Sequence, residues 1–98
     1  MSAHQSSQGW KLFLKLLKEP NMQAHLEEFF DLFFTSNEKM HLSARVLIIQ
    51  ELLENQLTQR EIAEQFNVSI SQITRGSNAL KNTKHSFYEK LANHLRAP

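Results

Sequence analysis

The chain has 98 residues, which is enough for one small domain with a modest core. It contains no cysteine, so disulfides and thiolate metal sites are excluded, and this composition fits a reducing compartment. The formal net charge of +1 indicates no class of partner by itself. With 2 glycines and 2 prolines the chain is poor in turn residues, which favours an all-α fold.

Residues 1–9 are polar and rich in serine and glutamine, and we expect them to form a flexible tail. They lack the features of a signal peptide, and no window approaches about 18 apolar residues. We therefore expect a cytoplasmic protein with no membrane partner. From Trp10 to Lys18, apolar residues recur at helical spacing with lysines opposite, and Pro20 ends this helix. We expect 10–98 to form a single all-α domain.

A second helix is predicted from Met22 to about Phe34, with Asn21 as its N-cap. Its C-terminal half, FFDLFF, is apolar almost all the way round, and such a helix must be buried on more than one side. The chain offers few other helices to cover it, so we expect an intertwined helical homodimer. The alternative is that the remaining helices of the same chain just manage the burial.

The next elements are predicted to be helical as well, which gives about six helices in total. Thr35 and Glu38 have the spacing of a capping box that starts a short helical turn. A strongly apolar helix from Leu42 to about Glu54 follows and leads into residues 57–81. The apolar residues of a last predicted helix are Phe87, Tyr88, Leu91 and Leu95.

Residues 57–81 have the pattern of a helix-turn-helix. Thr58 followed by Glu61 forms a predicted capping box, in which each side chain satisfies a backbone N–H of the first helical turn. The first helix should therefore begin at Gln59. Asn67, a residue that tolerates positive φ, stands where this helix should end.

The second helix of the pair should begin at Ile70, because Ser69 and Gln72 form another predicted capping box. Its outer face is polar and cationic, as a recognition helix needs for base edges and phosphates in a major groove. The alternative is an ordinary helical hairpin with a solvated polar face. The residues on this outer face are Ser71, Gln72, Thr74, Arg75 and Asn78.

The distribution of charge supports the helix-turn-helix as the DNA-binding part. Residues 1–56 carry five Lys or Arg against seven Asp or Glu, whereas residues 57–84 carry four against two. Because phosphate contacts dominate DNA affinity, this small excess predicts weak binding by one copy and a benefit from a second copy in a symmetric dimer. Two copies imply a palindromic operator with half-sites about one helical turn apart, or a multiple of that distance.

The sequence does not indicate an enzyme. Catalysis would need titratable residues that converge in a pocket. The histidines have no metal-ligand spacing and no evident nucleophile partner, so we expect neither catalytic nor metal-binding residues. The histidines are His4, His25, His41, His85 and His94.

The motif TRGSN in QITRGSNALK, preceded by LTQREIAEQF, resembles the reading head of the bacterial tryptophan (Trp) operon repressor family. The resemblance extends back through LSARVLIIQELLENQ to DLFFTSNEK. It implies a sequence-specific transcriptional repressor that binds double-stranded operator DNA as a dimer. It also implies that L-tryptophan acts as a corepressor in a pocket beside the recognition helix, with no other cofactor.

The resemblance also implies which residues bind the ligand. Arg45 and Arg75 match two arginines that flank the indole, and a guanidinium can both stack on an aromatic face and pair with a carboxylate. Thr35 matches a hydroxyl that accompanies the ligand carboxylate. Leu32 and Phe34 match positions whose backbone carbonyls receive the ligand's ammonium group from the opposite subunit.

Gly76 matches a glycine beside the indole, where the absence of a Cβ lets the ring approach. Taken alone, it is better explained as a helix-crossing contact, just as Arg45 could be a solvated residue and Thr35 only a cap. Ala79 departs from the family, which usually has a serine there that helps to hold the ammonium group. Ser43 is a milder departure, from a common glycine. Ala63 replaces a commonly basic residue in the reading head, which implies the loss of a phosphate contact.

For DNA, we expect the start of the recognition helix to read bases and its flanks to contact phosphates. The predicted DNA-binding residues are Gln59, Arg60, Ser69, Ile70, Ser71, Gln72, Thr74 and Lys81. Two alternative functions stay open: a ligand-independent helix-turn-helix DNA binder, and a helical protein-interaction module. The cationic outer face argues against the module, whereas only a ligand titration distinguishes the ligand-independent DNA binder.

Overall fold

The computed structural model describes residues 1–96. This part of the chain contains seven α-helices and no strand, so the predicted all-α fold is confirmed. Its contacts divide the chain into two compact units, Met1–Thr35 and the residues from Ser36 onward. Within the described residues, no helix combines the length and the apolar character needed to cross a membrane.

The first unit begins with α1 (Ala3–Lys18). The expected start at Trp10 was wrong, because Ser2 and Gln5 form a capping box that starts the helix earlier. The Ser2 N–H donates to Gln5 Oε1 (2.9 Å), and the Gln5 N–H donates to Ser2 Oγ (3.1 Å). The end before Pro20 was predicted correctly, since the residue before a proline is held in an extended conformation.

The predicted helix 22–34 is instead two helices, α2 (Pro20–Gln23) and α3 (Leu26–Phe33). The predicted cap Asn21 was wrong, because it lies inside α2. The proline occupies the first position of α2, where its fixed φ suits a helix and its missing N–H costs nothing. The backbone of His25 (φ −127°, ψ 27°) then separates α2 from α3.

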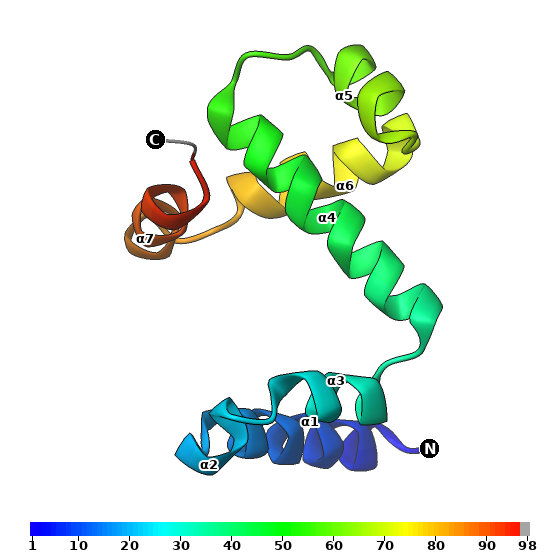
Figure 1. Ribbon diagram of the computed structural model, residues 1–98, viewed down its shortest axis with the longest axis vertical. Coiled ribbons are helices and arrows are strands. Elements are labelled where there is room, and N and C mark those ends of the chain that lie inside the picture. The colour runs from blue at the N-terminus through cyan, green and yellow to red at the C-terminus, as the bar shows by residue number, and fades with distance from the viewer. Residues whose placement is uncertain (97–98) are drawn as a thin grey trace. The chain divides into compact units, whose positions relative to one another are not determined.

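Aromatic rings hold α1 and α3 together in the first unit, whose ribbon runs from blue to cyan in Figure 1. The ring centroid of Phe13 lies 5.4 Å from that of Phe29 and 6.0 Å from those of Phe33 and Phe34. Phe29 is buried, but Leu32 is 76% exposed and Phe33 is 48% exposed. This chain alone therefore leaves part of the apolar α3 surface uncovered.

The second unit is arranged around the long helix α4 (Ser36–Glu54), which α6 crosses (Figure 1). The predicted short turn and the helix after it form this one continuous helix. The predicted helix-turn-helix is confirmed as α5 (Gln59–Phe66) and α6 (Ile70–Lys81). The last helix is α7 (His85–Leu95), as predicted.

Three isoleucines, one from each of three helices, form the buried core of the second unit. They are Ile48 from α4, Ile62 from α5 and Ile73 from α6, and all are almost fully buried. Burying one such side chain stabilises a fold by about 1.5–3 kcal/mol. This core therefore fixes both helices of the helix-turn-helix against α4.

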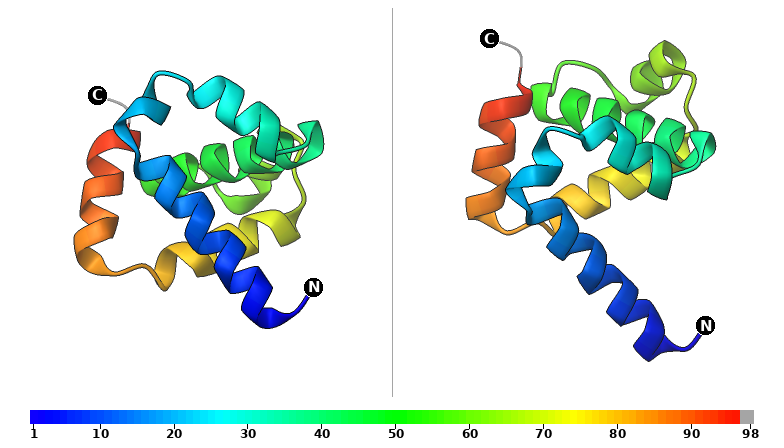
Figure 2. Two further views of the ribbon diagram at one scale, coloured as in Figure 1. Left: turned by 90° about the horizontal axis from the view of Figure 1, so that it is seen from below. Right: turned by 60° about the horizontal axis from the view of Figure 1, so that its bottom comes forward.

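Two hydrogen bonds attach the end of α7 to α4, and both views in Figure 2 show the two helices close together there. Gln50 Nε2 donates to the Leu95 carbonyl (2.8 Å), and Arg96 Nε donates to the Leu53 carbonyl (3.3 Å). Ala92 on α7 is buried. The last helix therefore packs back onto the core, as the sequence predicted.

Candidate functional site

The first helix of the helix-turn-helix begins and ends where the sequence predicted. The Thr58 N–H donates to Glu61 Oε1 (2.9 Å), and the Glu61 N–H donates to Thr58 Oγ1 (3.2 Å). These bonds, chiefly that from the Thr58 backbone, stabilise the carboxylate and hold the pKa of Glu61 below its ordinary value. α5 ends at Asn67, which is left-handed (φ 53°, ψ 48°).

The second helix has its own capping box. The Ser69 N–H donates to Gln72 Oε1 (2.8 Å), and the Gln72 N–H donates to Ser69 Oγ (3.0 Å). α6 therefore begins at Ile70, as predicted. Both boxes satisfy N–H groups that a helix start leaves without partners. The turn between α5 and α6 is bounded by the left-handed Asn67 on one side and by the Ser69 box on the other.

The predicted DNA-binding surface is accessible in the structure, with one exception. Gln72 is half-buried, and it also borders a hollow described below. Ile70, an apolar residue, is 50% exposed at the first position of α6. The predicted DNA-binding residues that are exposed are Gln59, Arg60, Ser69, Ile70, Ser71, Thr74 and Lys81.

A hollow of about 380 Å³ lies where α4 and α6 meet. α4 contributes His41 and Arg45, α6 contributes Gln72 and Arg75, and Ile48 of the core also borders it. The fold thus brings together the two arginines that the sequence proposed as partners around one ligand. Its polar walls are mainly cationic, so a ligand that fits them should carry a negative group.

Gly76 lies at the crossing of α4 and α6 and is buried. A Cβ at this position would lie 3.1 Å from Ile48 Cγ2 and 3.7 Å from Arg45 Cδ. The glycine therefore allows the two helices to approach closely, which supports the helix-crossing role left open by the sequence. Its position beside an indole stays a prediction.

The other predicted ligand residues lie elsewhere in the chain. Ala79 is exposed and lies one turn after Arg75 along α6. Leu32, Phe34 and Thr35 belong to the first unit. Their part in ligand binding stays a prediction.

His41 was not predicted as a residue of the hollow, and Gln72 was predicted to contact DNA alone. The signal for His41 was its position one helical turn before Arg45, because residues four apart share a helix face. Among residues 1–96, no group of three or more metal-ligating side chains is close enough to hold a metal ion.

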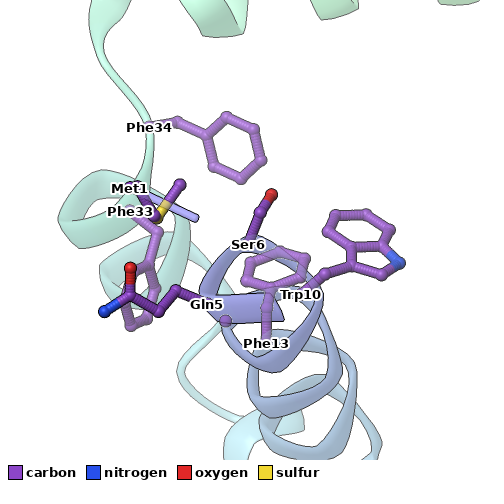
Figure 3. A pocket seen from close by; sticks show the side chains of 8 residues that line it. Met1, Gln5, Ser6, Trp10, Phe13, Phe33 and Phe34 are labelled. Atoms are coloured by element: carbon purple, nitrogen blue, oxygen red, sulfur yellow. The ribbon is translucent and has the colours of Figure 1, made fainter. Parts of the chain in front are cut away.

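The first unit has an apolar hollow of its own, of about 360 Å³, with aromatic rings around it (Figure 3). The rings of Trp10 and Phe13 are stacked, with centroids 5.5 Å apart. Trp10 is nevertheless 61% exposed. The residues around this hollow are Met1, Gln5, Ser6, Gly9, Trp10, Phe13, Phe33 and Phe34.

Comparison with known proteins matches residues 8–95 to a family described as Trp repressor protein. A Trp operon repressor homolog of Chlamydia trachomatis serovar L2 is 47% identical over 88 residues, covering 90% of this chain and 94% of the relative. A Trp operon repressor homolog of Chlamydia caviae is 46% identical, and the match covers 95% of this chain and 92% of the relative. A Trp operon repressor homolog of Haemophilus influenzae is 34% identical, and the match covers 88% of this chain and 85% of the relative.

Proposed function

We propose that this chain, which belongs to the Trp repressor protein family, is a cytoplasmic transcriptional repressor. Its homodimer binds operator DNA when L-tryptophan occupies the hollow between α4 and α6. The family consists of regulatory proteins, which confirms the expectation that the chain is not an enzyme. L-tryptophan acts as a corepressor ligand.

The observation that carries this proposal is the convergence of Arg45 and Arg75 on one hollow. Tryptophan combines a flat aromatic ring with a carboxylate, and a guanidinium plane can stack on the first and pair with the second. The volume of about 380 Å³ lies within the range of roughly 300–1,000 Å³ that is usual for small-molecule sites.

The position of the hollow explains how a ligand would control DNA binding. Arg75 follows directly after Thr74, which is exposed on the outer face of the recognition helix. A ligand between α4 and α6 therefore acts on the same helix that meets DNA. It favours the DNA-binding conformation to the extent that it binds this conformation more tightly.

The second half of the ligand site would come from the other subunit. We infer that the backbone carbonyls of Leu32 and Phe34 of the partner subunit receive the ammonium group, and that its Thr35 hydroxyl accompanies the carboxylate. Ala79 cannot supply the hydroxyl that the family usually offers. A water molecule in its place can make the same hydrogen bond at little cost.

A second copy of the chain would also cover the apolar surface of the first unit. Leu32, Phe33 and Trp10 are large apolar residues that stand exposed on α3 and α1. An exposed apolar patch of this kind is typical of a protein interface. We therefore propose an obligate dimer in which residues 10–98 act as a single domain.

On DNA, α6 would enter the major groove with its first turns. The hydroxyls of Ser71 and Thr74 can reach base edges, and the exposed Ile70 suits the methyl group of a thymine. Arg60 and Lys81 would contact phosphates. Because the dimer presents two recognition helices, its operator should be palindromic.

Calorimetry with L-tryptophan, with and without operator DNA, tests the proposal. Arg75→Ala removes both the stacking surface and the carboxylate partner, so it should nearly eliminate tryptophan binding. Lys81→Ala is the matched control, since it removes a cation from the same helix outside the hollow. It should keep tryptophan binding, weaken all operators alike and reduce the salt slope by about one unit.

Two results would replace the proposal by its alternatives. Operator binding by the parent protein without any heat from tryptophan would indicate a ligand-independent DNA binder. The absence of both operator and tryptophan binding would indicate a helical protein-interaction module.

A further inference from the structure

The side chain of Gln72 belongs both to the start of α6 and to the hollow. Its Oε1 accepts the Ser69 N–H (2.8 Å) in the capping box. Gln72 also borders the hollow, together with Arg45 and Arg75. One residue thus belongs both to the proposed ligand site and to the turn from which the recognition helix begins.

The capping box decides which end of this amide is left for a ligand. The Ser69 N–H needs an acceptor, so the amide oxygen must face it and the NH₂ group becomes the other end. Within residues 1–96, this NH₂ group makes no hydrogen bond. Gln72 can therefore offer a donor to the hollow, where both guanidinium groups are donors as well.

The other capping box of the same motif shows that a glutamine is not required for capping. Glu61 caps α5 with the same pair of hydrogen bonds, and its carboxylate is fully exposed. A glutamate at position 72 would cap α6 equally well, but it would place a negative charge beside the two arginines. A carboxylate ligand would then meet repulsion where glutamine offers a hydrogen bond.

We propose that Gln72 is a positioning residue for the corepressor, with Nε2 donating to the ligand's carboxylate while Oε1 holds the Ser69 N–H. The bound ligand and the first turn of α6 are then connected through one side chain. A ligand bound in the hollow therefore stabilises the first turns of α6, which carry the exposed residues Ser71 and Thr74. This inference rests on the proposed function.

The test compares Gln72→Glu with Glu61→Gln, which exchanges the same two side chains at the solvent-exposed box. Both variants keep a complete capping box, so their helix content should match that of the parent protein. Calorimetry gives the affinity for L-tryptophan. Fluorescence anisotropy with operator DNA gives the factor by which L-tryptophan raises operator affinity.

Gln72→Glu should weaken L-tryptophan binding by at least about tenfold, because it loses a hydrogen bond to a charged group and adds repulsion. The factor by which L-tryptophan raises operator affinity should fall with it, whereas Glu61→Gln should resemble the parent in both measurements. Tryptophan binding by Gln72→Glu as tight as by the parent would overturn the inference. An equal loss in Glu61→Gln, or a loss of helix content in Gln72→Glu, would also overturn it.

The two proposals fail in different ways. If the parent protein gives no heat with L-tryptophan, the proposed function is wrong. If the parent binds L-tryptophan and Gln72→Glu binds it equally well, only the role of Gln72 is wrong.

Discussion

Gly76→Ala tests how tightly α4 and α6 are packed at their crossing. In a helix interior, alanine is favoured over glycine by about 1 kcal/mol, so propensity alone predicts a gain in stability. The added Cβ, however, would lie 3.1 Å from Ile48 Cγ2, whereas carbon atoms prefer about 3.5–4.0 Å. The outcome depends on whether Ile48 can yield by a few tenths of an ångström.

Ile48 has little freedom to do so. Its side chain is almost fully buried in the core, and its β-branched structure restricts rotation about χ1. Overpacking of this kind costs about 1–3 kcal/mol, which exceeds the gain from propensity. We therefore expect Gly76→Ala to lower the free energy of unfolding by up to about 2 kcal/mol. It should also weaken tryptophan binding, because Arg45 Cδ lies 3.7 Å from the new atom.

A double-mutant cycle in urea, at one protein concentration, separates the two effects. Ile48→Leu removes the Cγ2 methyl group at nearly constant volume, so Gly76→Ala should be less costly in that background. We expect a coupling free energy of about 0.5–3 kcal/mol. If Gly76→Ala alone stabilises the protein by the full propensity gain, the reasoning about this crossing is refuted.

Three further predictions concern the partner subunit, the ligand and the pH dependence of stability. Sedimentation at low micromolar concentration should show a dimer, and a well-folded monomer would contradict both the dimer and its shared ligand site. Ala79→Ser should strengthen L-tryptophan binding severalfold, as measured by calorimetry. An unchanged affinity would show that the missing hydroxyl does not affect binding. Because the pKa of Glu61 is lowered in the folded state, its carboxylate contributes stability above its ordinary pKa of 4.5. That stability is lost as the pH falls through the lower, folded pKa. Glu61→Gln should remove this pH dependence in urea unfolding, and an unchanged pH profile would contradict the assignment.

The helix-turn-helix was predictable because its signals are local. Each capping box depends on residues three apart, and Asn67 can adopt positive φ without a tertiary partner. The same spacing rule also fits the start of α1, since Ser2 and Gln5 have the spacing of another capping box. The helix start at this box was not predicted because the polar residues around it have no apolar periodicity.

The break between α2 and α3 and the hollow depend on information beyond local pattern. Pro20 predicts the end of one helix, but a proline also starts helices well, and here it begins α2. Periodicity placed Arg45 and Arg75 on their helices, but it could not give the crossing of α4 over α6. That crossing depends on the contact between Gly76 and Ile48, which joins distant parts of the chain.

The attachment of α7 to α4 has a consequence for how this sequence can change during evolution. Gln50 and Arg96 donate to the main-chain carbonyls of Leu95 and Leu53, and not to their side chains. Every amino acid provides that carbonyl, so substitutions at 53 and 95 leave both acceptors in place. Substitutions at positions 50 and 96 are therefore restricted because they remove a hydrogen-bond donor. Substitutions at positions 53 and 95 are restricted only by side-chain packing.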